Sequence, residues 1–101
     1  MIEEYYPEVL QAIPTDDYTV YVYFDDGRIK LFDAKELVTK GIFKPLQDIK
    51  KFKSTCTVLN NTLAWDLQGN YDTTKCLDID PFVIYNDYPE VEEPTHLFNN
   101  H

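Results

Sequence analysis

The sequence predicts a small α+β domain, with a mainly antiparallel sheet of two β-hairpins and short helices packed on it. The segment YTVYVYF, residues 18–24, is β-branched and aromatic throughout, and the turn sequence DDG follows it. A second β-rich pair, 54–59 and 62–67, is separated by two asparagines. Between the two pairs, apolar residues recur at helical spacing. Together these three patterns predict one domain in which two β-hairpins are separated along the chain by short helices.

Length and composition indicate a single folded unit. The chain has 101 residues, of which 44% are hydrophobic and 15% aromatic, whereas disordered chains are poor in both. The segment DYPEVEEPTHLFNNH combines two prolines with a cluster of acids. We therefore expect residues 1–87 to form one α+β domain and residues 88–101 to be an acidic, weakly ordered C-terminal tail.

The first hairpin is the clearest local pattern. Residues 8–13 could form a short strand that ends at Pro14. In the strand 18–24, alternation places Val20, Val22 and Phe24 on one side and the tyrosines on the other. Gly27 is suited to the positive φ of a hairpin turn, and RIKLFD, residues 28–33, returns as the partner strand.

Two short helices are expected between the hairpins. Asp33 can cap a helix over 34–38, and Gly41 suits its end. A second helix should have Pro45 in its first turn and an apolar stripe through 46, 49 and 52. With the strands, these helices give the predicted core: Val20, Val22, Phe24, Ile29, Leu31, Leu37, Phe43, Leu46, Ile49, Phe52, Val58 and Trp65.

The stretch CLDIDPFVIY, residues 76–85, could contain a carboxylate-based functional site, or it could be the structural junction at the start of a helix. Asp80 before Pro81 is typical of a helix start, where the aspartate accepts a backbone N–H. The alternative is a metal-dependent or small-ligand enzyme, because clustered carboxylates can hold Mg²⁺ or Ca²⁺. The residues that would form that site are Asp66, Asp72, Asp78 and Asp80. Local spacing favours the helix start for Asp80 and leaves Asp78 open.

Other residue types give no catalytic pattern. Cys56 and Cys76 are too far apart for a redox CxxC motif, so we expect both to be small core residues. His96 and His101 lie in the expected tail, and Ser54 has no nucleophile-elbow sequence around it. We therefore expect a non-enzymatic protein that uses no cofactor.

The charge is large, negative and segregated. The chain carries a net −9: residues 1–27 hold seven acids and no base, residues 28–53 hold eight bases and three acids, and residues 54–101 hold eight acids and one base. Direct nucleic-acid binding needs clustered bases, so this balance argues against it. Neither a signal peptide nor a membrane-length apolar run is present, so we expect a cytoplasmic protein without membrane contact.

Aromatic and acidic residues supply the candidate partner contacts. Tyrosine and tryptophan are frequent anchors at protein interfaces, and an acidic segment can dock on a basic partner. The candidates are Tyr21, Tyr23 and Trp65 as anchors, with Glu90, Glu92 and Glu93 as the charged segment.

The order of these elements resembles a known bacterial family. YTVYVYFDDGR is followed by FD, by GIFKPLQD, by a Phe, by a β-rich pair ending at Trp65, and by Asp72. This series, from about Asp17 to Tyr85, is similar to the family called domain of unknown function 2442. The segment TTKCLDIDP after Asp72 departs from the family's usual ending. The resemblance implies a small α+β protein with no established activity and no assigned catalytic residues, and it implies two-gene operons similar to toxin–antitoxin pairs.

The leading functional hypothesis is therefore an acidic protein-binding module. Its partner would be a protein with a basic surface encoded nearby. This chain would then be the neutralising member of a toxin–antitoxin-like pair. Two alternatives stay open: the aspartate-based enzyme, and a structural homo-oligomer that uses the sheet face or a strand edge.

Overall fold

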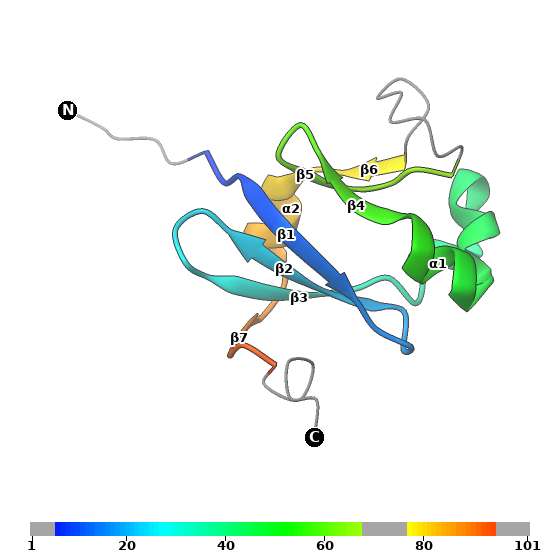
Figure 1. Cartoon of the computed structure of the whole chain (residues 1–101), viewed down its shortest axis with the longest axis horizontal. Coiled ribbons are helices and arrows are strands. Elements are labelled where there is room, and N and C mark those ends of the chain that lie inside the picture. Colours follow the sequence, from blue (N-terminus) through cyan, green and yellow to red (C-terminus); the bar gives the residue numbers. More distant parts are fainter. Residues whose placement is uncertain (1–5, 68–76, 95–101) are drawn as a thin grey trace.

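Two antiparallel sheets joined by short helical segments make up the fold, which a computed structural model describes for residues 6–67 and 77–94 (Figure 1). The first sheet has the strand order β1-β2-β3-β7, and the second has the order β4-β5-β6. The strands are β1 Val9–Pro14, β2 Thr19–Phe24, β3 Ile29–Asp33, β4 Cys56–Leu59, β5 Thr62–Trp65, β6 Leu77–Ile79 and β7 Glu90–Val91. The helical segments are η1 Leu37–Thr39, η2 Gly41–Gln47, α1 Ile49–Thr55 and α2 Pro81–Asp87.

The α+β class and the antiparallel pairing are confirmed, but the strands divide into two sheets. The helical segments separate β3 from β4 along the chain, and β7 takes the free side of β3. β4 therefore pairs with β5 and starts a second sheet, which lies above the first in Figure 1.

The β2–β3 hairpin forms as predicted. The Phe24 N–H donates to the Arg28 carbonyl at 2.9 Å, and the Gly27 N–H donates to the Phe24 carbonyl at 3.1 Å. Gly27 has φ +94°, in the region that a side chain makes costly. The sequence DDG therefore encodes this turn through its third residue.

The two edges of the first sheet come from distant segments. β1 precedes β2 and pairs with it, and Pro14 stands in this edge strand opposite Val20. On the other edge, Glu90 pairs with Lys30 and Val91 with Ile29. We predicted a weakly ordered tail over 88–101, but its residues 90–91 form β7. Residues 95–101 lie outside the described part of the chain.

The β4–β5 hairpin also follows its sequence signal. Asn60 and Asn61 have φ of 52° and 57°, the two positive values of a type I′ turn. β6 then pairs with β5, with Ala64 opposite Asp78. This strand, residues 77–79, leads directly into Asp80, the cap of α2.

The helices between the hairpins start later than the sequence indicated. We predicted that Asp33 caps a helix over 34–38, but η1 begins at Leu37 with Glu36 as its N-cap, and Asp33 only accepts the Lys35 N–H at 2.9 Å in the preceding turn. Similarly, Pro45 lies inside the 3-10 helix η2, and the α-helix begins at Ile49. Asp48 has extended backbone angles and accepts the Lys50 N–H at 3.0 Å, so it ends η2 and caps α1.

The core lies between the two sheets and the helical segments. Of the predicted core residues, six are buried: Val20, Val22, Phe24, Leu46, Phe52 and Trp65. The placement of Ile29 and Leu31 in that core was wrong, because they pair with Tyr23 and Tyr21 and so share the outer face with them. Phe32, opposite Val20, is the β3 residue that enters the core.

The Asp80 cap gives a direct test of this fold. Asp80 accepts the Phe82 N–H at 2.9 Å at the start of α2. Asp80→Ala should lower the free energy of unfolding by about 1 kcal/mol, measured by urea denaturation. The neighbouring exposed Asp78 is the matched control, and Asp78→Ala should leave stability nearly unchanged. Equal losses in the two variants would contradict the cap assignment.

Candidate functional site: the tyrosine face

The outer face of the first sheet gathers aromatic and aliphatic side chains from four strands. Tyr21 stands between Ile13 of β1 and Leu31 of β3, and Tyr23 stands beside Ile29 of β3. Val91 of β7 extends the row next to Ile29. Directly opposed residues of antiparallel strands share a face. We call this half-buried set the tyrosine face: Ile13, Tyr21, Tyr23, Ile29, Leu31 and Val91.

The register explains why both sides of this sheet are apolar. Val20, Val22 and Phe24 point to the core, so the alternate residues of β2 must point outward. In many antiparallel sheets the outward set is polar. Here it is mainly tyrosine, isoleucine and leucine, and its polar members are Gln11 opposite Tyr23 and the pair Thr19–Asp33. An outward face of this composition is typical of a binding surface.

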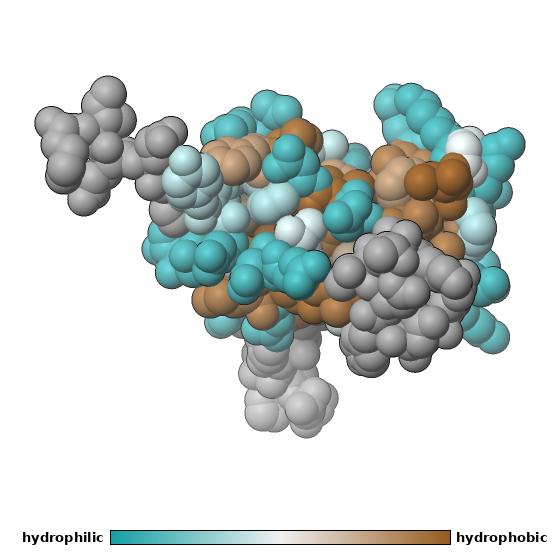
Figure 2. Space-filling model, turned by 90° about the horizontal axis from the view of Figure 1, so that it is seen from above, coloured by the Kyte–Doolittle hydropathy of each residue, from teal (hydrophilic) through white to brown (hydrophobic). Residues whose placement is uncertain are grey.

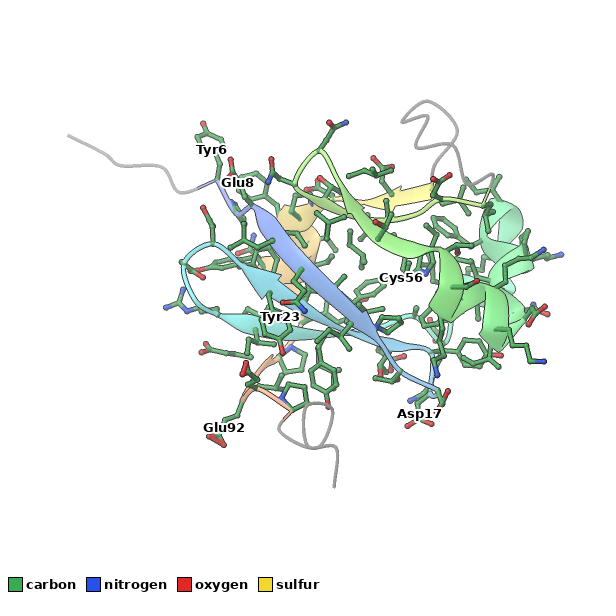
Figure 3. All side chains as sticks on the ribbon, in the orientation of Figure 1. Tyr6, Glu8, Asp17, Tyr23, Cys56 and Glu92 are labelled. Carbon is green, nitrogen blue, oxygen red and sulfur yellow. The ribbon has the colours of Figure 1, made fainter. Side chains whose placement is uncertain are left out.

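Acidic side chains lie at two margins of the tyrosine face. Glu92 and Glu93 follow β7 and are exposed, and Asp16 and Asp17 lie in the turn between β1 and β2. Figure 3 shows Glu92 beyond Tyr23 at one end of the sheet and Asp17 at the other. Glu90 is partly neutralised, because its carboxylate lies 3.5 Å from the Arg28 guanidinium. The face therefore combines an apolar centre with an acidic rim.

The Tyr23 hydroxyl is a buried polar group without a hydrogen-bond partner among the described residues. Its oxygen is shielded from solvent, and none of the described residues forms a hydrogen bond with it. Burial raises the pKa of this phenol, and the charges of Glu93 and Tyr21 raise it further. An unpaired buried hydroxyl costs free energy.

A cleft of about 520 Å³ continues the tyrosine face at the β1–β2 turn. Tyr21 and Leu31 line it from the sheet. Across it, the Lys53 ammonium lies 2.7 Å from the Asp16 carboxylate and joins α1 to the turn. The cleft offers a recess for one side chain of a partner beside the flatter face.

Trp65 does not belong to this surface. Its side chain is fully buried, and its Nε1–H donates to the Phe52 carbonyl at 3.1 Å. The proposal of Trp65 as an interface anchor is therefore corrected: it is a core residue. Of the other partner candidates, Tyr21 and Tyr23 lie on the face, and Glu92 and Glu93 follow β7 at its margin. Glu90 does not join them, because it pairs with Lys30 and so points to the opposite side of the sheet.

The aspartates of the metal alternative occupy different settings. Asp66 is buried, Asp78 is exposed on β6, and Asp80 caps α2. Within residues 6–67 and 77–94, no three potential ligands come together as a metal site. Asp72 lies outside the described residues, as do Cys76, His96 and His101. The enzyme alternative therefore stays a prediction that gains no support from the described geometry.

Sequence reasoning missed a polar cluster that fixes α2 to the β2–β3 hairpin. The Tyr85 hydroxyl donates to the Asp26 carboxylate at 2.5 Å and accepts from the Arg28 guanidinium. Lys30 lies 5.2 Å from the centroid of the same ring, a cation–π contact. Asp26 and Tyr85 are 59 positions apart, so no local spacing could reveal this contact.

The cluster makes one carboxylate a stronger acid. Partial burial opposes ionisation of Asp26, but hydrogen bonds from the Tyr85 hydroxyl and the Arg28 backbone outweigh it and lower the pKa of Asp26. Because its pKa is lower in the folded state, Asp26 stabilises the fold at pH values above 3.8, the ordinary pKa of the carboxyl group. That stabilisation is lost as the pH falls through the lowered folded-state pKa.

Asp26→Asn should therefore reduce the acid sensitivity of the fold. At pH 7 the variant should be less stable than the parent by about 1 kcal/mol, because a charge-assisted hydrogen bond is weakened at a partly exposed site. Near pH 2 the difference should largely vanish. Urea denaturation at the two pH values measures this, and Tyr85→Phe should weaken the same pH dependence. A constant difference across pH would contradict the assignment.

Cys56 lies opposite Trp65 in the second sheet, and burial raises the pKa of its thiol to about 12. The thiolate is the reactive form of cysteine, so this thiol should be inert in the folded protein. Its folded-state pKa lies above the ordinary value of 9.0. The associated stability is present below pH 9 and is lost as the pH rises toward 12.

In a Cys76→Ser background, Cys56 should react slowly with a thiol-specific chromogenic reagent at pH 8. Addition of urea should make the reaction fast, because unfolding restores an ordinary thiol pKa. Protein refolded by removal of urea should react slowly again, which controls for irreversible changes caused by the urea. Equal rates with and without urea would show that Cys56 is accessible in the folded state.

The comparisons with known proteins give one family match. A family model described as "Protein of unknown function (DUF2442)" matches residues 9–90. No curated protein and no solved structure matches the chain. The matched range includes the whole tyrosine face apart from Val91. Among the described residues, no helix is long and apolar enough to cross a membrane.

Proposed function

This chain belongs to the DUF2442 family, and we propose that it is a non-enzymatic protein-binding module that docks a basic partner on its tyrosine face. The partner we favour is a protein encoded nearby, which this chain would neutralise as in a toxin–antitoxin-like pair. The family resemblance is the reason to expect a partner encoded by a neighbouring gene. The fold supplies the surface on which that partner would dock.

The observation that carries the proposal is the apolar centre with an acidic rim. Protein interfaces commonly have a core of aromatic and aliphatic anchors that a more polar rim shields from water. Tyr21 and Tyr23 are suited to be anchors, because each has a rigid, half-buried aromatic ring on this face. The cleft beside Tyr21 would accept a protruding side chain, which is where interface energy tends to concentrate.

Charge supports a basic partner. Of the rim acids, Asp16 is paired with Lys53, whereas Glu92 and Glu93 have no ion-pair partner within the described part of the chain. The whole chain adds a net charge of −9. Such a field speeds the approach of positively charged proteins and repels acidic ones. Association should therefore slow as ionic strength rises.

A structural homo-oligomer could use the same surface. The tyrosine face is apolar enough to pair with itself, and β6 and β7 are short edge strands. The negative rim opposes such pairing, because two copies would bring like charges together. Light scattering on the isolated chain distinguishes the two functions, since the binding-module proposal expects a monomer before partner addition.

Tyr21→Ser and Tyr23→Ser should each weaken partner binding at least tenfold, as loss of an interface anchor typically does. The measurement is co-purification with the product of the neighbouring gene, followed by titration calorimetry. Ile42→Ser is the matched control: Ile42 is 69% exposed on η2, outside the tyrosine face, so its loss should leave binding unchanged.

Two outcomes would contradict the proposal. In the first, the parent chain elutes alone and shows no change when the neighbouring gene product is added. In the second, a complex forms but the tyrosine variants and the Ile42 variant bind equally. Far-ultraviolet circular dichroism of all three variants verifies that they are folded.

A further inference from the structure

A separate cleft of about 530 Å³ lies where β3, η1, β6 and α2 meet. Phe32 lines it, and Phe32 points to the opposite side of β3 from the tyrosine face. Leu37, Ile79 and Val83 add aliphatic side chains, and Tyr88 adds a second ring. The volume falls in the usual range of small-molecule sites, which are mostly apolar with a few placed polar groups.

The two rings of the cleft stand against each other. The centroids of Phe32 and Tyr88 are 4.8 Å apart, with ring planes inclined by 58°. Phe32 is almost fully buried, whereas Tyr88 is half-buried at the end of α2. The negative face of such a ring attracts a cation within about 6 Å of its centroid. The cleft therefore offers apolar contact together with an aromatic surface for positive charge.

Carboxylates give the surroundings of Tyr88 a negative potential. Asp33 and Glu36 line it directly, and Asp87 precedes Tyr88 in sequence. Burial raises the pKa of the Tyr88 phenol, and the charges of these three carboxylates raise it further.

Two lysines also line the cleft, in different situations. Lys35 lies 3.9 Å from Asp33, which offsets its charge. Lys40 is exposed and forms no salt bridge with any residue in the described ranges. Lys40 therefore opposes a cation close to its own ammonium, and the favourable place for a cation is beside Tyr88, where the three carboxylates act.

We propose that this cleft binds a small amphipathic amine, with its ammonium group near Glu36 and Tyr88 and its apolar body against Phe32, Ile79 and Val83. An aromatic or short alkyl amine has the single charge and the single apolar body that this arrangement complements. The site is distinct from the tyrosine face, so it goes beyond the proposed protein-binding function.

The test compares two molecules with the same apolar body and opposite charge. The full chain, labelled with ¹⁵N, is titrated with 3-phenylpropylamine and separately with 3-phenylpropanoate, and amide chemical shifts are followed. We expect saturable shifts in η1, β6 and the end of α2 with the amine, and none there with the carboxylate at the same concentration. Absence of saturable shifts with the amine, or equal binding of the carboxylate, would overturn the proposal.

Two variants of exposed lining residues sharpen the test. Glu36→Gln should weaken binding of the amine about threefold, as loss of one exposed charge contact does. Lys40→Gln should strengthen it by a similar factor, because it removes the opposing charge. Equal affinities in both variants and the parent would overturn the role assigned to the carboxylates. Both variants should bind the protein partner as the parent does, so failure here is distinguishable from failure of the tyrosine-face proposal.

Discussion

The burial of Trp65 is the constraint on which the rest of the fold depends. Its ring contacts the ring of Phe52 from α1, with centroids 5.5 Å apart, and lies 6.5 Å from that of Phe32 in the first sheet. Its Nε1–H finds the Phe52 carbonyl, so the polar end of a large apolar side chain is satisfied inside the core. One residue of β5 therefore holds the second sheet, the helix and the first sheet together.

This arrangement determines which aromatic residues remain at the surface. Because the two sheets close over Trp65, Phe52 and Phe32, the inward side chains of β2 and Phe32 of β3 are used by the core. The tyrosines of β2 are left on the outward face, together with Ile29 and Leu31. β7 then adds Val91 to that face and brings Glu92 and Glu93 to its margin. The core packing and the tyrosine face follow from one alternation along β2.

Local sequence signals predicted the parts of the fold that are decided locally. Gly27 and the pair Asn60–Asn61 adopt the positive φ values that their turns require, and Asp80 accepts the N–H that a cap accepts. RIKLFD was misleading, because alternation marked Ile29 and Leu31 as core while pairing with β2 placed Phe32 there. Register is a property of two strands, so one strand's pattern cannot fix it when both of its faces are apolar.

The candidate site was predictable in part for the same reason. Composition identified Tyr21 and Tyr23 as candidate interface anchors, but it also suggested Trp65. The sequence around a single tryptophan does not show whether it is a core residue or an interface anchor. Contacts between distant segments, such as β7 on β3 or Tyr85 on Asp26, leave no periodic trace in the sequence.

Acrylamide quenching of the fluorescence of Trp65, the single tryptophan, tests the central packing claim most directly. Emission from the native protein should be blue-shifted and weakly quenched until urea unfolds it, whereas strong quenching of the native protein would contradict the account.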